Sequence, residues 1–201
     1  MDPRVLRRFI IIVAIATLVM FSLSVGYKFF TPPPGDYEVR KGDILLGDKQ
    51  YEEAIRWFDK ALVAQPDHRG ALMGRALAFI QSERYPEAMA ELDYIVELLP
   101  KVIEADDLTG RGVLAAAYAN RGIIHDRLGR HQKALADYVK SLEIDSDTVS
   151  GPDLFYKILY DPRPSNVRDR ARYIYEQLQK PEGERLMRVP KLDAKQRMYK
   201  P

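Results

Sequence analysis

The chain begins with an uninterrupted apolar run. Phe9–Tyr27 contains no charged side chain, and basic residues flank it at Arg8 and Lys28. An α-helix rises about 1.5 Å per residue, so this run spans roughly 28 Å, close to the ~30 Å hydrocarbon core of a bilayer. The pattern predicts a transmembrane helix over residues 9–30, preceded by a basic flank at residues 1–8.

A cleaved signal peptide has the same order of basic and apolar segments and is the alternative interpretation. The apolar run is longer than a usual signal-peptide core, however. The bulky sequence Tyr27-Lys28-Phe29-Phe30 also stands where a signal peptidase needs small residues. A buried core helix would carry a polar stripe, which this segment lacks. These features favour an uncleaved anchor.

The charges around the anchor predict its orientation. Three arginines precede the apolar run, whereas Lys28 alone follows it closely. The positive-inside rule then places Met1 in the cytoplasm and residues 31–201 across the membrane. For a bacterial inner membrane, that side is the periplasm. Residues 31–35 (Thr-Pro-Pro-Pro-Gly) form a proline-rich spacer, which favours an extended, semi-rigid conformation.

Beyond the spacer, apolar and small residues recur with a period of 34. Residues 35–68 align with 69–102, and a third copy fits residues 115–148 after an insertion of 12 residues, 103–114. Small residues recur at Gly42, Ala76 and Gly122 and at Ala54, Ala88 and Ala134; large ones recur at Phe58, Leu92 and Tyr138. A period of this length is typical of stacked supersecondary units.

Each repeat is predicted to be a pair of antiparallel helices. The small positions let the two helices of a repeat approach closely, and the large ones fill the space between repeats. Pro66 and Pro100 are predicted to end the second helices, because proline cannot continue a helix. The insertion is predicted to form a longer loop or to extend a helix. The resulting fold class is all-α, an α-solenoid of about three helix-pair repeats.

These residues resemble the tetratricopeptide-repeat (TPR) family over about residues 35–148. The resemblance is carried by Tyr51-Glu52-Glu53-Ala54-Ile55 with Phe58, and by the run from Leu128 to Tyr138. It implies a TPR α-solenoid that binds proteins, here of an N-terminally membrane-anchored bacterial type. The sequence departs from the family pattern in the insertion, in Ser146 where a proline is usual, and in the lack of a first-helix tryptophan.

Residues 149–179 are predicted to be a degenerate terminal helix pair that caps the solenoid. A short helix is expected over 153–160, and a longer one runs from a cap at Ser165 to about Gln179. Its polar outer face is expected to carry Arg168, Arg170 and Arg172. Residues 180–201 lack periodicity and are predicted to be an extended basic tail that stays disordered unless a partner orders it.

The TPR resemblance implies a partner-binding groove on the concave face formed by the first helices. The corresponding residues are Arg40, Asp43, Met73, Leu77, Ile80, Asn120, Ile123 and Arg127. Asn120 matches a frequent groove asparagine of the family, whose amide can bond both the N–H and the C=O of a peptide. The alternative is that the apolar members pack against the insertion or the terminal helices. The lysines and paired asparagines that bind chaperone C-termini are missing, so that specificity is not implied.

Formal charge divides the chain into three parts. Residues 1–30 carry +3 and residues 163–201 carry +6, which leaves −7 on the stretch between them. The basic end offers contacts for anionic headgroups or for an acidic protein surface; a solubilising cap is the plainer interpretation. The residues expected to make these contacts are Arg168, Arg172, Arg185, Arg188 and Lys191.

Nothing in the sequence predicts an enzyme. Cysteine is absent, and no phosphate-binding loop, nucleophile elbow or zinc-protease motif occurs. Of the three histidines, His131 replaces a packing tyrosine of its repeat, His68 lies in a turn, and His125 has no ligand one helical turn away. No cofactor, metal, nucleic acid or small-molecule substrate is expected.

The predicted function is that of a membrane-anchored scaffold for protein–protein interaction. The first hypothesis is an accessory or assembly subunit of a larger membrane complex. The alternative is a TPR receptor that targets or imports other proteins at a membrane surface, with its repeats facing the cytosol. A regulatory arm of an enzyme is a third reading, but residues 180–201 are too short to supply a catalytic site.

Overall fold

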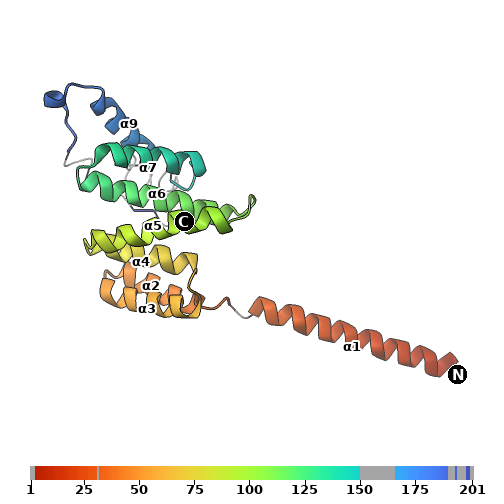
Figure 1. Ribbon diagram of the computed structural model, residues 1–201. Coiled ribbons are helices and arrows are strands. Elements are labelled where there is room, and N and C mark those ends of the chain that lie inside the picture. Colours follow the sequence, from red (N-terminus) through yellow and green to blue (C-terminus); the bar gives the residue numbers. More distant parts are fainter. Residues whose placement is uncertain (1–2, 31, 150–165, 190–192, 194–197, 200–201) are drawn as a thin grey trace, which may run out of the picture.

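The computed structural model describes the whole chain except residues 1–2, 31, 150–165, 190–192, 194–197 and 200–201, and it describes the backbone alone for residues 24–30. The described residues contain α-helices, one short 3-10 helix and no strand. Figure 1 shows one long helix projecting from a stack of shorter helices that succeed one another in chain order. This arrangement confirms the predicted all-α solenoid with an apolar N-terminal helix.

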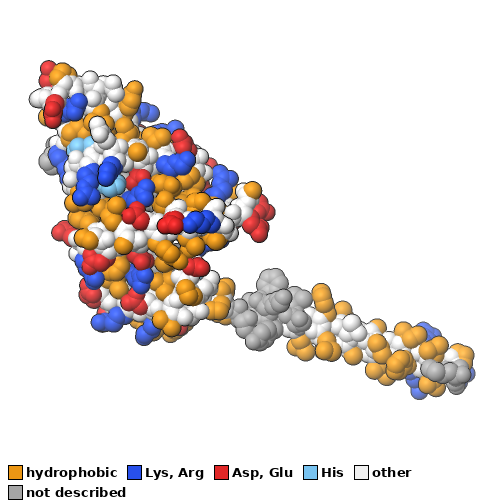
Figure 2. All heavy atoms as spheres, viewed as in Figure 1, with side chains coloured by type: hydrophobic (Ala, Val, Ile, Leu, Met, Phe, Trp, Pro, Cys, Tyr) orange, Lys and Arg blue, Asp and Glu red, His pale blue; other side chains and the backbone are white. Residues whose placement is uncertain are grey.

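The projecting helix is α1 (Pro3–Phe30). Its apolar part, Pro3–Leu23, is long and apolar enough to cross a membrane, as a signal sequence also is. No part of this span is buried against the rest of the described chain. Figure 2 shows hydrophobic side chains over its surface. The hydroxyl of Thr17 donates to the carbonyl of Val13 at 2.9 Å, which removes an unpaired polar group from the apolar helix.

Three helix pairs form the stack. Each first helix packs on its second helix, and α4 and α6 also pack on the pair before them. The first helices contact one another in the order α2, α4, α6. The pairs are α2 (Asp36–Gly47) with α3 (Tyr51–Ala64), α4 (Arg69–Gln81) with α5 (Tyr85–Val102), and α6 (Leu108–Arg127) with α7 (His131–Ile144).

Close approach at glycines fixes how the helices pack. The fully buried ring of Phe58 lies so near Gly42 and Gly74 that a Cβ at these positions would stand 2.6 and 2.4 Å from ring carbons. A Cβ added at Gly122 would likewise stand 2.7 Å from ring carbons of Tyr138. One ring of the first pair therefore packs on the first helices of two successive repeats, and only glycine leaves room for it.

The structure corrects the prediction for Pro100. α3 ends at Ala64, ahead of Pro66, as predicted, but Pro100 lies inside α5, which continues to Val102. Proline removes a single N–H from the last turn of this 18-residue helix, and buried apolar side chains at Leu92, Ile95 and Leu99 hold that helix in place. The insertion extends a helix: α6 has 20 residues, against 13 in α4.

Beyond the third pair, α9 (Val167–Leu178) packs on α7, followed by the 3-10 turn η1 (Glu182–Glu184). The side chain of Asn166 caps α9 by accepting from the N–H of Asp169 at 2.8 Å. Ser165, the predicted cap, and the helix predicted over 153–160 lie outside the described residues. Arg170 was expected on the polar outer face of this helix but is buried.

Candidate functional site

The first helices place the predicted groove residues along one side of the stack. On α2, Arg40 is exposed and Asp43 is half-buried. Most of the others are buried: Met73, Leu77 and Ile80 on α4, and Asn120 and Ile123 on α6. Arg127, near the end of α6, is half-buried and donates to the hydroxyl of Tyr85 at 3.5 Å. Burial of the central members means that other parts of the chain pack on these positions of the first helices.

Part of that cover is the chain's own C-terminal segment. The side-chain amide of Asn120 donates from Nδ2 to the carbonyl of Tyr199 at 2.7 Å, and its Oδ1 accepts from the N–H of Tyr199 at 2.8 Å. Asn120 is fully buried, and Tyr199 is nearly so. One side chain of α6 thus binds both main-chain groups of a residue 79 positions away. Met198 and Tyr199, the residues that the structure describes here, lie outside any regular element.

A sulfur atom and a buried aromatic residue complete the surroundings of this contact. Met73 on α4 places its Sδ 3.6 Å from Nδ2 of Asn120. Met198 packs on the same core, to which Tyr138 also belongs. Burial raises the pKa of Tyr138 well above its usual value, so its hydroxyl stays neutral. Tyr138 also lies within electrostatic reach of Asp126 and Arg170, so the buried surroundings of the contact combine apolar and charged groups.

A buried ion pair holds the terminal helix and the tail next to this site. Arg170 on α9 donates to the carboxylate of Asp126 on α6 at 2.6 and 2.9 Å. The same guanidinium donates to the carbonyl of Met187 at 3.2 Å and lies 3.2 Å from the carboxylate of Asp193. Asp126 also lies 3.2 Å from Nδ1 of His131. Burial alone would lower the pKa of Arg170, but the bonds to Asp126 outweigh it, and the pKa is raised.

The residues predicted as basic tail contacts differ in their surroundings. Arg168 and Arg172 are exposed on α9, and Lys191 lies outside the described residues. Arg185 folds back to donate to the carbonyls of Lys180 and Leu178, and Arg188 donates to the carbonyl of Arg127. The described parts of the tail thus contact their own chain, which differs from the expectation of a tail ordered by a separate partner.

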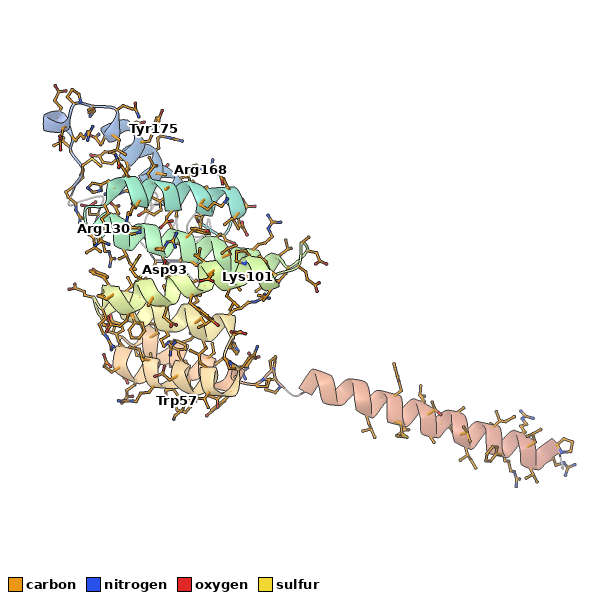
Figure 3. All side chains as sticks on the ribbon, in the orientation of Figure 1. Trp57, Asp93, Lys101, Arg130, Arg168 and Tyr175 are labelled. Carbon is orange, nitrogen blue, oxygen red and sulfur yellow. The ribbon has the colours of Figure 1, made fainter. Side chains whose placement is uncertain are left out.

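Sequence reasoning missed a series of ion pairs that joins successive repeats. Arg75 on α4 contacts Glu91 of its own repeat at 2.7 Å and Asp59 of the preceding repeat at 2.6 Å. Arg121 on α6 repeats the pattern with Asp137 at 2.7 Å and Asp93 at 2.8 Å. Figure 3 labels Asp93 in the middle of the stack. The signal was available, since Arg75 and Arg121 occupy the same place in the aligned repeats.

The histidines serve structural contacts. His68 caps α4, where Nδ1 accepts from the N–H of Ala71 at 3.4 Å, and its Nε2 lies 2.9 Å from Asp36. His125 is buried 3.9 Å from Asp137, and burial lowers its pKa despite that carboxylate. In the part of the chain that the structure describes, no three His, Asp or Glu side chains are grouped so that they could hold a metal ion.

Comparison with known proteins agrees with this architecture. Family models of the tetratricopeptide repeat match residues 39–103 and 115–147. Hsp70-Hsp90 organizing protein 2 of Arabidopsis thaliana is 23% identical over 118 residues, which cover 59% of this chain and 19% of that protein. The Hsp70-Hsp90 organizing protein of Triticum aestivum is 21% identical over 153 residues, which cover 76% of this chain and 22% of that protein. The chain thus spans about a fifth of the length of these curated relatives.

Two solved structures share the fold. The first TPR of Spaghetti (RPAP3) bound to the HSP90 peptide SRMEEVD superposes with a TM-score of 0.52 at 20% identity, covering 73% of this chain and 94% of that one. The first TPR domain of human RPAP3 gives 0.53 at 20% identity, covering 77% and 99%. Together with the family models, these neighbours identify the helix pairs as tetratricopeptide repeats, stacked as an α-solenoid behind one apolar N-terminal helix.

Proposed function

We propose that this protein is a membrane-anchored interaction protein whose concave groove binds an extended segment of another protein. TPR domains mediate protein–protein interaction, and α1 is long and apolar enough to serve as the anchor. The observation that carries the proposal is the contact between Asn120 and Tyr199. An amide that holds both the N–H and the C=O of one residue recognises main chain, whatever the side chain.

In this proposal the C-terminal segment around Tyr199 is an intramolecular competitor of the partner. It is connected to the groove through the same chain, so its effective concentration at Asn120 is high. A partner segment therefore has to displace Tyr199 before it can bind Asn120. Groove affinity for a partner is reduced by the fraction of time that the chain's own segment occupies the site.

The groove favours an apolar segment. Met73, Leu77 and Ile123, which are predicted to line it, are apolar, whereas the peptide in the Spaghetti structure, SRMEEVD, is acidic. Arg40 and Arg127 at the two ends of the groove are the residues that we propose hold acidic groups flanking such a segment.

We further propose that the protein is an accessory or assembly subunit of a larger membrane complex in a bacterial inner membrane. The excess of arginine before the apolar run Phe9–Tyr27 supports a cytoplasmic N-terminus, with the repeats in the periplasm. Confinement to the bilayer raises the local concentration of the groove around other membrane proteins, so a weak contact with one extended segment suffices.

Purification of the full chain from membranes in a mild detergent tests the groove. The wild type should bring down a stoichiometric membrane partner. Asn120→Ala should reduce that recovery about tenfold, because two buried hydrogen bonds to main chain are lost. The control is Gln132→Ala, an exposed amide on α7, which should change nothing.

Removal of residues 194–201 separates the tethered-segment idea from the groove itself. The shortened chain should recover more partner than the wild type, and Asn120→Ala should cancel that gain. Recovery of the wild type and of the shortened chain only as free monomers would refute the groove proposal. Digestion of the repeats by protease in intact cells would instead support the receptor function, with the repeats in the cytosol.

A further inference from the structure

The outer face of the first repeat has the composition of an inter-repeat joint, although no repeat precedes it. In the aligned repeats, three positions of the first helix face the preceding pair. They are Tyr37, Lys41 and Ile44 in the first repeat, Ala71, Arg75 and Ala78 in the second, and Ala117, Arg121 and Ile124 in the third.

In the second and third repeats these positions are closed. Ala71 and Ala78 are completely buried, as are Ala117 and Ile124. The arginine between them binds a carboxylate on the second helix of the preceding repeat, Asp59 in one joint and Asp93 in the next. Each joint thus combines two buried apolar positions with one ion pair across it.

In the first repeat the same positions are open. Tyr37 is 52% exposed and Ile44 is 61% exposed. Lys41 stands 5.8 Å from the centre of the Tyr37 ring, and no carboxylate of the described residues lies within ion-pair distance of its ammonium group. A terminal repeat that merely meets water would carry polar residues at Tyr37 and Ile44.

The neighbouring second helix adds an aromatic residue and another cation. Trp57 stands where the later repeats have Glu91 and Asp137. Its ring meets that of Tyr37 edge to face, with centroids 6.1 Å apart, and the ammonium of Lys60 lies 4.0 Å above it. Figure 3 shows Trp57 at the end of the stack, and Figure 2 shows basic side chains along the same edge.

We propose that this end face, made by Tyr37, Lys41, Ile44, Trp57 and Lys60, docks a helix pair of a partner subunit that presents a carboxylate to Lys41. The partner would continue the stack in place of a preceding repeat. The charge of the face favours an acidic helix, since every established joint pairs a cation of the later repeat with a carboxylate of the earlier one.

A second copy of this chain does not fit that role. Two such end faces brought together would oppose Lys41 and Lys60 to the same lysines, which is repulsive. The other end of the solenoid has Val139 at the position of Asp59 and Asp93, so it offers no carboxylate there. Tyr37 is also much larger than the alanine of the internal joints, so the partner needs a small residue opposite it.

Site-specific photo-crosslinking of the full chain in its native membranes tests the proposal. A photoreactive amino acid at position 44 should crosslink to a helical segment of another protein that contains Asp or Glu, as mapped by mass spectrometry. Lys41→Glu should lower that crosslink about tenfold, because attraction is replaced by repulsion. Reversing the mapped carboxylate to lysine should restore it. The control is a photoreactive residue at Val139, which is also exposed, at 44%, on α7.

Each other outcome overturns the proposal. Crosslinks from position 44 only to lipid would make the end face a membrane contact, and crosslinks only to this chain would make it a self-association surface. A protein crosslink that Lys41→Glu leaves unchanged would show that Lys41 binds no carboxylate of the partner. Because Asn120 lies in the groove rather than on the end face, Asn120→Ala should leave the crosslink intact, so failure of the groove proposal is distinguishable from failure of this one.

Discussion

Loss of Arg170 should destabilise the protein more than the loss of any surface arginine. Its partner Asp126 is 1% exposed, so Arg170→Met leaves the carboxylate of Asp126 buried without its arginine. The contact of that carboxylate with Nδ1 of His131, at 3.2 Å, remains. Removing one member of a buried pair costs about 3–5 kcal/mol. Since Asp126 keeps its contact with His131, we expect the lower end, about 3 kcal/mol. At roughly 2–4 °C per kcal/mol for a chain of this size, Tm should fall by about 6–12 °C.

The assay is thermal unfolding of the full chain in detergent, followed by circular dichroism. Arg168→Met is the matched control, because it removes the same charge from an exposed position of the same helix, labelled in Figure 3. It should stay within about 0.5 kcal/mol of the wild type. The double variant Arg170→Met with Asp126→Leu should recover most of the loss, since no charge is then left buried. Equal Tm values for the two single arginine variants would refute the reasoning.

Three further outcomes are expected. Gly74→Ala should cost about 1–3 kcal/mol of unfolding free energy, because the new methyl group meets the ring of Phe58. A methyl group at Gly47 meets nothing within 4 Å, so Gly47→Ala should be neutral or should stabilise the fold by up to about 1 kcal/mol. Equal losses for the two variants in denaturant titration would contradict this. His125 has a lowered pKa through burial, so the unfolded chain binds a proton that the folded chain resists, and stability should fall as pH drops from about 7 to 5. His125→Asn should flatten that dependence of Tm on pH; an unchanged slope would count against it. Asn120→Ala should also speed hydrogen exchange of the Tyr199 amide at least about tenfold without changing exchange in α4, and unaltered exchange at Tyr199 would contradict the groove contact.

The repeats could be predicted from the sequence because their signal is local and recurs. Small residues at Gly42 and Gly122, and large ones such as Phe58 and Tyr138, mark close approach and filling at a fixed spacing. Such a period specifies which helices pair without any knowledge of distant contacts. Pro100 failed as an end signal because a proline in the last turn costs little when buried side chains just before it, such as Leu99, already hold the helix in place.

The candidate site could be predicted only in part. The groove residues follow from the repeat register, and Asn120 was among them. Its ligand was not predictable, since neither charge nor periodicity links Tyr199 to a position 79 residues earlier. Arg170 was misplaced for a related reason: an arginine between two other arginines suggests a solvated face, and the partner that buries it, Asp126, lies 44 residues away.

The span between Asn120 and Tyr199 has a consequence for the order of events during synthesis. Contacts within the solenoid join neighbours and form as each helix pair leaves the ribosome, whereas this contact must wait for nearly the whole chain. Until then the amide of Asn120 faces an open groove. A partner made at the same time and place meets the groove before its internal competitor does, so assembly during translation avoids the displacement step that the finished protein requires.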